Sequence, residues 1–174
     1  EFWTIENAEK KGRKRLYSKE DIELIKNTKK YSKSEILSIA EQEARKYGIN
    51  PVLIKAIIQT ESTYKQFNKS RAGARGLMQI MPITIKHWSD PSRLNLDNAN
   101  PFDAKQNIQI GVKHFADLLK KFKGNIRDAL SAYNCGETNY RKYKKGQKNL
   151  AEETRRYPTR VLNNTNIFGE RIYA

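Results

Sequence analysis

Apolar residues recur at helical spacing along most of this 174-residue chain, and this periodicity constrains the fold more than any other feature of the sequence. Ser34 can cap a helix whose apolar stripe ends at Tyr47, and Gly48 follows where a helix C-terminus favours glycine. Asn50 and Pro51 then repeat the start signal, because asparagine caps helices and proline favours the first helical position. The alternation typical of β-strands is not found over any useful length, so the sequence predicts an all-α fold.

Four further helices are expected in the rest of the chain, and most of them have a recognisable boundary. Pro82 can open a short helix, Gly124 can end a longer one, and Gly136 can end the next. The expected helices cover residues 82–88, 103–123, 126–134 and 151–162. The segment before Ser34 is polar and lysine-rich, so we expect a basic N-terminal arm at residues 1–33 and one multi-helix domain at residues 34–174.

The net charge of +15, from 34 Lys and Arg against 19 Asp and Glu, indicates an anionic partner. Nucleic acid, acidic lipid and an anionic cell wall all satisfy that charge, and composition does not choose among them. The single cysteine, Cys135, excludes an internal disulfide. Residues 1–15 contain no apolar run of signal-peptide length, and no stretch approaches the ~20 apolar residues of a membrane span. If the protein is exported, its signal sequence is not contained in these residues.

One carboxylate, that of Glu61, is expected on an apolar helix face. The apolar residues of that face are Leu53, Ile54, Ile57 and Ile58, and Glu61 follows the last two by four and three residues. Such an acid has two interpretations: a structural acid paired with an arginine or a helix N-terminus, or a general acid whose pKa burial has raised. A polar, glycine-containing loop follows Glu61, and this position favours the second interpretation. A general acid suits glycosidic cleavage, because the leaving sugar oxygen must be protonated as the bond breaks.

Other chemistry has less support in the sequence. Most glycosidases use a second carboxylate, but spacing does not choose among Asp90, Asp97, Asp103, Glu137, Glu152 and Glu153. His87 and His114 lie in separate helical segments with no second ligand at metal spacing. Cys135 has no histidine near it in the sequence, so a packing role is favoured over a nucleophilic one. We therefore expect no metal site and no cofactor.

Three ordered motifs extend the Glu61 site along the chain. The first comprises Glu61-Ser62, Ser70, residues 73–82 (GARGLMQIMP) and Thr84. The second is residues 132–136 (AYNCG), and the third is residues 153–157 (ETRRY) with Val161. Together they resemble the signature of the soluble lytic transglycosylase catalytic domain, a family related to goose-type lysozyme. The resemblance runs from about residue 36 to residue 162.

This resemblance implies a lysozyme-like α fold with a substrate cleft at residues 34–174, acting on strands of alternating N-acetylmuramic acid and N-acetylglucosamine. It implies that Glu61 alone protonates the glycosidic oxygen and then recovers a proton from the muramyl 6-hydroxyl, which closes a 1,6-anhydro ring without water. The substrate's acetamido group would supply the stabilisation that a second carboxylate otherwise gives. The substrate-binding residues implied by matching position are Ser70, Gln79, Met81, Tyr133, Asn134, Glu153 and Tyr157.

For several of these positions a simpler interpretation stays open. Met81 can be core filling, Tyr157 can pack without touching substrate, and Glu153 can pair with a neighbouring arginine at the surface. For Tyr133 and Asn134, the resemblance implies contact with the scissile region and orientation of Glu61.

The expected partner is the peptidoglycan glycan strand, in the periplasm, the cell envelope or outside the cell. An anionic cell-wall or membrane surface would hold the basic protein, and a place in an envelope-spanning assembly stays open. A hydrolytic lysozyme on the same substrate is the first alternative. The second is a basic helical nucleic-acid-binding protein that uses residues 10–15 and 141–148, but no helix-turn-helix or zinc-finger signature supports it.

Overall fold

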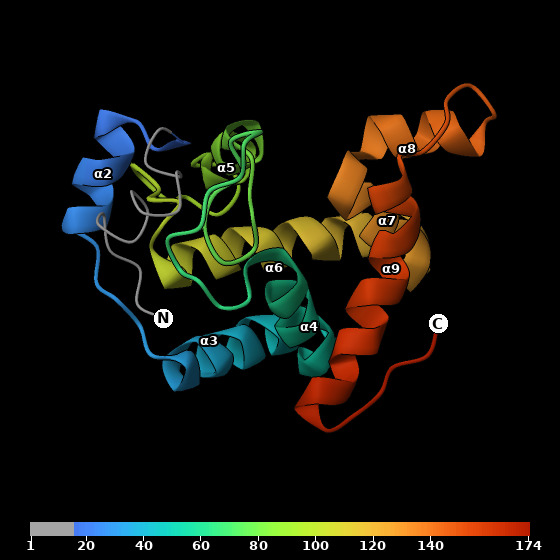
Figure 1. Ribbon diagram of the computed structural model, residues 1–174, viewed down its shortest axis with the longest axis horizontal. Coiled ribbons are helices and arrows are strands. Elements are labelled where there is room, and N and C mark those ends of the chain that lie inside the picture. The colour runs from blue at the N-terminus through green and yellow to red at the C-terminus, as the bar shows by residue number, and fades with distance from the viewer. Residues whose placement is uncertain (1–15) are drawn as a thin grey trace. The chain divides into compact units, whose positions relative to one another are not determined.

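The computed structural model describes residues 16–174, and this part of the chain is built from helices and loops (Figure 1). All six helices expected from the sequence are present, with boundaries close to the predicted ones. They are α3 (Lys33–Lys46), α4 (Pro51–Ser62), α5 (Pro82–Ser89), α6 (Ala104–Lys121), α7 (Ile126–Cys135) and α9 (Glu152–Asn164). Pairing of β type among the described residues is limited to two isolated bridges, which join Lys69 to Arg75 and Arg75 to Ile80. The predicted all-α fold is confirmed.

Within residues 16–174, two further helices and a short 3-10 turn were not expected. They are α2 (Lys19–Lys26), α8 (Glu137–Lys144) and η2 (Thr165–Phe168). Helix α2 lies inside the segment expected as a basic arm, and it begins with a capping box in which Ser18 and Asp21 bond each other's backbone amides. The basic run at residues 10–15 lies outside the described residues, and the domain division at residues 33 and 34 stays a prediction.

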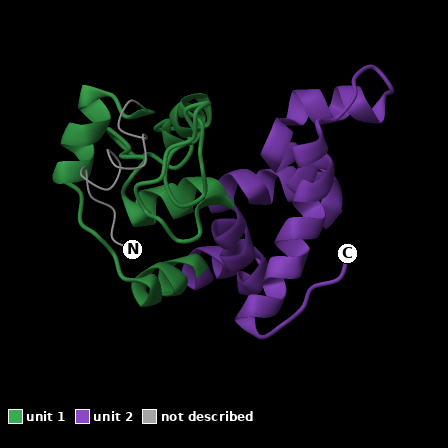
Figure 2. Cartoon of the chain, in the orientation of Figure 1, with its two compact units in different colours: residues 1–40, 61–111 green, residues 41–60, 112–174 purple. Residues whose placement is uncertain are grey.

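The chain divides into two compact units, and each unit is made of two separate stretches of sequence (Figure 2). Unit 1 comprises residues 1–40 and 61–111. Unit 2 comprises residues 41–60 and 112–174. The chain passes from one unit to the other inside α3, at the end of α4 and inside α6.

Unit 1 contains a small apolar cluster that holds α2 against the loop following α4. Tyr17, Ile25, Phe67 and Phe102 form this cluster, and each is at most 9% exposed. The Tyr17 hydroxyl donates a 2.7 Å hydrogen bond to the carbonyl oxygen of Phe67. The buried side-chain amide of Gln66 donates to the carbonyl oxygen of Phe102 at 3.0 Å. The described part of the expected arm is therefore packed, because its apolar side chains bury surface against residues far along the chain.

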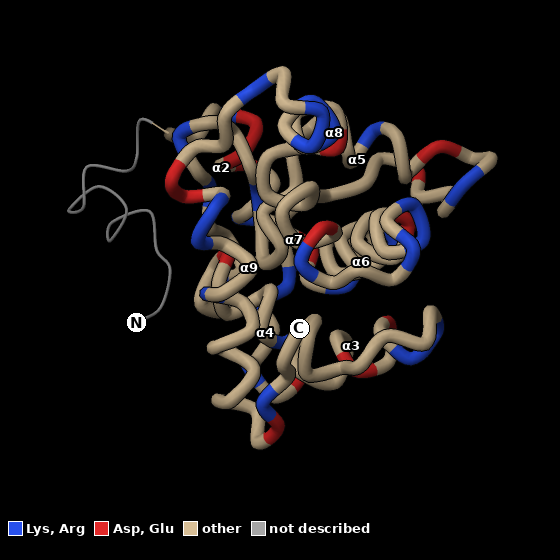
Figure 3. The backbone as a smooth tube through the Cα atoms, turned by 90° about the vertical axis from the view of Figure 1, so that its right-hand side faces the viewer, with Lys and Arg blue, Asp and Glu red and all other residues tan. Residues whose placement is uncertain are grey.

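Unit 2 is organised around the contact between α7 and α9. Ala129 and Leu130 of α7 are fully buried, as are Val161 of α9 and Phe115 of α6. Helix α8 differs from these, because Tyr140 is its buried residue and the rest of it is polar. Figure 3 shows Lys and Arg on both units, and α8 carries three of them in its last turn. Among the described residues, no helix is both long and apolar enough to cross a bilayer.

Candidate functional site

Glu61 is the second-last residue of α4, and its side chain is half-buried. Ile57 and Ile58, one turn earlier, are 0% exposed, so the apolar face expected for this helix is present. Thr63 and Tyr64 follow with φ angles of 49° and 63°, and these left-handed conformations end the helix. Glu61 therefore stands where a buried helix meets a loop.

The loop at residues 67–81 carries most of the first motif, and backbone hydrogen bonds define its shape. Arg75 and Ile80 exchange two of them, each 3.0 Å from nitrogen to oxygen. The Gly76 amide donates to the carbonyl oxygen of Asn68 at 2.8 Å. The start and the end of the 67–81 loop are thus each bonded to its middle, at Gly76 and Arg75.

Asn107 of α6 holds the 67–81 loop from the interior of unit 1, where it is 1% exposed. Its Oδ1 accepts from the Met78 amide at 2.8 Å, and its Nδ2 donates to the carbonyl oxygens of Arg75 at 2.9 Å and Pro101 at 2.8 Å. A Cβ atom at Gly76 would lie 2.3 Å from Asn107 Nδ2 and 2.4 Å from Pro101 O. Only glycine leaves room for this arrangement.

Asp21 of α2 is a buried carboxylate that binds two cations of the 67–81 loop. It is 3% exposed. One oxygen accepts from Lys69 Nζ at 2.5 Å, and the other accepts from Arg75 Nε at 3.0 Å. Burial alone would raise the pKa of Asp21, but hydrogen bonds from Lys69, the Ser18 amide and Arg75 outweigh it and hold the pKa below its ordinary value. Asp21, Lys69 and Arg75 are called the Asp21 cluster below.

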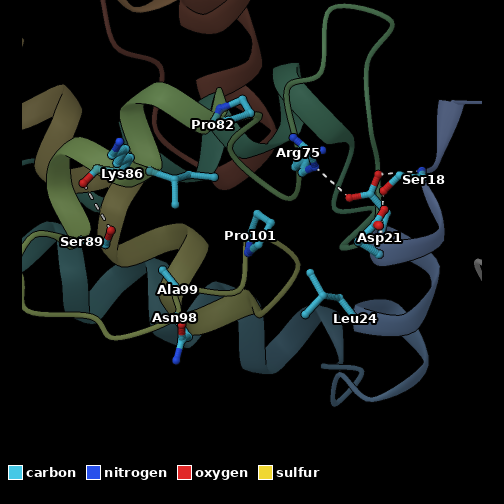
Figure 4. Close-up of a pocket in the computed structure, with 12 residues that line it drawn as sticks. Ser18, Asp21, Leu24, Arg75, Pro82, Lys86, Ser89, Asn98, Ala99 and Pro101 are labelled. Carbon is cyan, nitrogen blue, oxygen red and sulfur yellow. Dashed lines mark hydrogen bonds and ion pairs between the residues drawn. The ribbon is translucent and has the colours of Figure 1, made fainter.

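A cavity of about 610 Å³ lies beside the Asp21 cluster in unit 1 (Figure 4). Its size falls in the range of small-molecule sites. Its walls come from α2, from α5 and from the segment that precedes α6. Glu61 is not among the lining residues, which are Ser18, Glu20, Asp21, Leu24, Arg75, Pro82, Ile85, Lys86, Ser89, Asn98, Ala99 and Pro101.

The three predicted substrate-binding residues of unit 1 all belong to the 67–81 loop. Gln79 has a φ of 52°, and its side-chain amide donates to the carbonyl oxygens of Asn68 at 3.2 Å and Gly76 at 2.9 Å. The Ser70 hydroxyl accepts from a backbone amide four residues later at 3.0 Å. Met81 is 39% exposed. Two of the three residues therefore shape the loop, while Met81 is exposed.

In unit 2 the structure brings the second motif next to the third. The Thr154 hydroxyl donates to Asn134 Oδ1 at 2.7 Å, which joins α7 to α9. The ring of Tyr133 lies 6.1 Å from that of Phe115 between centroids, in an edge-to-face arrangement. Glu153 is exposed, whereas Tyr157 is 1% exposed and packs within unit 2.

Among the candidate second carboxylates, Glu137 and Asp90 have pKa values below the ordinary ones for their side chains. Hydrogen bonds from Lys121 and Arg141 lower the pKa of Glu137, and the ion pairs measure 2.9 and 2.8 Å. Hydrogen bonds from Ser92 lower the pKa of Asp90. Neither group suits proton donation near neutral pH.

Sequence reasoning did not find Asp21 or Asn107, and it placed Thr154 in the third motif without giving it a role. The capping box of Ser18 and Asp21 is a readable signal, but it predicts a helix start and not a buried ion cluster. No local pattern predicts the contacts of Asn107 or Thr154, because all but one of their side-chain hydrogen bonds reach partners 20 or more residues away. The part of the chain from residue 16 onward holds no group of three or more His, Cys, Asp or Glu arranged to hold a metal.

The helical architecture is shared with solved lytic transglycosylases, which places this chain in the lysozyme-like class of all-α proteins. An inactive variant of the lytic transglycosylase Slt from Pseudomonas aeruginosa is 30% identical and has a TM-score of 0.67, over 76% of this chain and 23% of that one. The 70-kDa soluble lytic transglycosylase of Escherichia coli is 25% identical, also with a TM-score of 0.67, over 77% of this chain and 24% of that one.

The family model described as Transglycosylase SLT domain matches residues 38–155. The chain therefore belongs to the SLT transglycosylase family, as the three motifs predicted. A transglycosylase of Enterobacteria phage PRD1 is 35% identical over 121 residues, 70% of this chain and 39% of that protein. The membrane-bound lytic murein transglycosylase C of Edwardsiella ictaluri is 32% identical over 130 residues, 66% of this chain and 35% of that protein. This chain thus spans less than half the length of these relatives.

Proposed function

We propose that this protein is a peptidoglycan lytic transglycosylase with Glu61 as its single general acid and base. The observation that carries the proposal is the position of Glu61, a half-buried carboxyl at the end of the apolar helix α4. Membership of the SLT family and the murein transglycosylases among its relatives supply the substrate class.

In the proposed reaction Glu61 first donates a proton and then accepts one, and no water is consumed. The Glu61 carboxyl gives its proton to the oxygen between N-acetylmuramic acid and N-acetylglucosamine, and the bond from this oxygen to the muramyl anomeric carbon breaks. The acetamido group of the same sugar stabilises the positive charge that develops. The Glu61 carboxylate then takes the proton of the muramyl 6-hydroxyl as that oxygen bonds to the anomeric carbon. The products are an anhydro-muramyl end and a free N-acetylglucosamine hydroxyl.

The proposed substrate contacts come from the three motifs. In unit 1, Met81 offers an exposed apolar surface to a sugar ring, and Ser70 and Gln79 keep the 67–81 loop in the shape that presents it. In unit 2, Tyr133 and Asn134 would contact the scissile region and orient Glu61. Glu153 and Tyr157 would complete the cleft, and the burial of Tyr157 favours a positioning role for it over direct stacking on sugar.

We also propose that the protein works in the periplasm or cell envelope, or outside the cell. Peptidoglycan lies there, and relatives such as that of Edwardsiella ictaluri are named as membrane-bound murein enzymes. The net charge of +15 would concentrate the enzyme at an anionic wall or membrane surface, and added salt would weaken that attraction. Assembly with other envelope proteins is compatible with this location, whereas binding to nucleic acid has no motif in its favour.

Product analysis on purified sacculi tests the proposal. We expect anhydro-muropeptides, which mass spectrometry separates from hydrolysis products because they lack one water. Glu61→Gln should abolish product, while Glu23→Gln, at an exposed position of α2, should not. Reducing ends in place of anhydro ends would indicate a hydrolytic lysozyme. Full activity of Glu61→Gln would remove Glu61 from the mechanism.

A further inference from the structure

Helix α2 lies outside the segment that matches the SLT family model, yet it supplies a buried acid to the loop that carries the first motif. The match begins at residue 38, and α2 ends at Lys26. Asp21 of α2 forms ion pairs with Lys69 at 2.5 Å and Arg75 at 3.0 Å. The side chains of these two cations are only 11% and 19% exposed. The Asp21 cluster therefore links a segment beyond the family match to the predicted sugar-binding loop.

Arg75 connects Asp21 to the residues that the proposed function assigns to sugar binding. Its guanidinium donates to Asp21 through Nε (Figure 4). It also donates to the Gly73 carbonyl oxygen through Nη1 at 3.1 Å. Its backbone exchanges two 3.0 Å hydrogen bonds with Ile80. Gln79 and Met81 are the residues on either side of Ile80. A shift of Arg75 would thus be passed to both of them through a short, hydrogen-bonded path.

We propose that Asp21 is a positioning residue for glycan binding, acting through Arg75 and Lys69 on the segment from Gln79 to Met81. This rests on the proposed function, in which that segment contacts sugar. Without the carboxylate, two partly buried cations lose their counter-charge, and they regain favourable solvation only by moving toward water. Because both cations belong to the 67–81 loop, that movement displaces the loop. Asp21 itself touches no reacting atom in this mechanism.

The effect of the Asp21 cluster can be distinguished experimentally from the effect of the apolar packing of α2. Ile25 is 6% exposed and belongs to the apolar cluster of unit 1, so Ile25→Val weakens the packing of α2 and leaves Asp21 in place. Glu20 is the exposed neighbour of Asp21, so Glu20→Gln removes the same charge from the same helix without touching the ion cluster. Asp21→Asn removes the charge at nearly constant volume.

Steady-state kinetics on soluble, uncrosslinked glycan strands provide the first test. We expect Asp21→Asn to raise KM about tenfold with little change in kcat, the pattern of lost binding common to ground state and transition state. Ile25→Val and Glu20→Gln should keep the wild-type KM. The Arg75→Gln variant keeps the ion pair between Asp21 and Lys69, so this variant should fold even if Asp21→Asn does not. It should raise KM in the same way as Asp21→Asn. An unchanged KM in Asp21→Asn, or an equal rise in Ile25→Val, would overturn the positioning role.

Amide hydrogen exchange on the same proteins provides a second test that needs no enzyme activity. The amides of Arg75 and Ile80 bond across the 67–81 loop, so they should be protected in the wild type and exchange faster in Asp21→Asn or Arg75→Gln. Glu20→Gln should exchange like the wild type. If the wild type releases no anhydro product but the exchange pattern holds, the proposed function fails and the link from Asp21 to the loop stands. If exchange at Arg75 and Ile80 is unchanged in both variants, the link itself is wrong.

Discussion

Gly76→Ala should destabilise the protein far more than Gly73→Ala, although the two glycines lie three residues apart in one loop. Both have positive φ angles, of 81° and 98°, so an alanine is strained at either position by about 1–2 kcal/mol. The surroundings differ. A Cβ at Gly73 meets nothing within 4 Å, whereas a Cβ at Gly76 meets Asn107 Nδ2 at 2.3 Å and Pro101 O at 2.4 Å.

The additional cost at Gly76 follows from the hydrogen bonds that Asn107 must give up. Asn107 is 1% exposed and bonds to the Met78 amide and to the carbonyl oxygens of Arg75 and Pro101. Losing two or three such bonds costs about 2–3 kcal/mol, because each contributes about 1 kcal/mol net. The backbone oxygen of Pro101 cannot rotate away as a flexible side chain could. We therefore expect Gly76→Ala to lower the free energy of unfolding by about 3–5 kcal/mol, a large share of an ordinary domain's stability.

Urea unfolding followed by tryptophan fluorescence, with both glycine variants made in a Trp3→Phe background so that Trp88 alone emits, measures this difference in unit 1, where Trp88 is 7% exposed. Replacing glycine by alanine also restricts the unfolded chain, but this effect is equal in the two variants and cancels in the comparison. With a slope of about 2 kcal/mol per molar urea, the midpoint of Gly76→Ala should lie about 1 M below that of Gly73→Ala. Equal midpoints would refute this expectation, because they would mean that Asn107 and Pro101 can move aside without lowering the free energy of unfolding.

Two further predictions follow from groups whose pKa values are shifted. Because the pKa of Asp21 is lower in the folded protein than its ordinary value of 3.8, its ion pairs stabilise the fold above that pH, and this stabilisation is lost as the pH falls toward the folded pKa. The difference in Tm between wild type and Asp21→Asn should therefore narrow from pH 7 to pH 3, and a constant difference would contradict this account. Burial raises the pKa of the Cys135 thiol, so its reaction with a disulfide reagent at pH 8 should be slower than that of free cysteine. Reaction as fast as that of free cysteine would show that the thiol is not shielded.

Periodicity and capping signals predicted six helices, because in each of them the apolar stripe faces a core. Helix α2 is as short as α5 but lacks a proline at its start, and it is held by Tyr17 and Ile25 packing on Phe67 and Phe102 from distant parts of the sequence, so it was missed. Helix α8 was missed because its buried residue is the single Tyr140, so it has no apolar stripe to read. Short helices fixed by tertiary contacts leave little local signal.

The same contrast between local signals and distant contacts applies to the candidate site. The place of Glu61 on an apolar face could be read from its spacing to Ile57 and Ile58, and the structure has both isoleucines fully buried. The amide of Gln79, in contrast, is occupied by backbone carbonyl oxygens of its own loop. The partners of Asp21 lie 48 and 54 residues away, so no window of sequence brings them together. The family resemblance identified the motif residues, but the Asp21 cluster, which holds their loop, could be recognised only in the structure.

The alternation of the two units along the sequence has a consequence for dissecting this protein. Each unit draws on two stretches of chain, and the stretch at residues 41–60 that belongs to unit 2 is flanked on both sides by unit 1. A single cut of the polypeptide therefore yields no fragment that contains one whole unit and nothing of the other. Fragment complementation, with two separately expressed pieces that must associate to recover structure, suits this chain better than the isolation of either half.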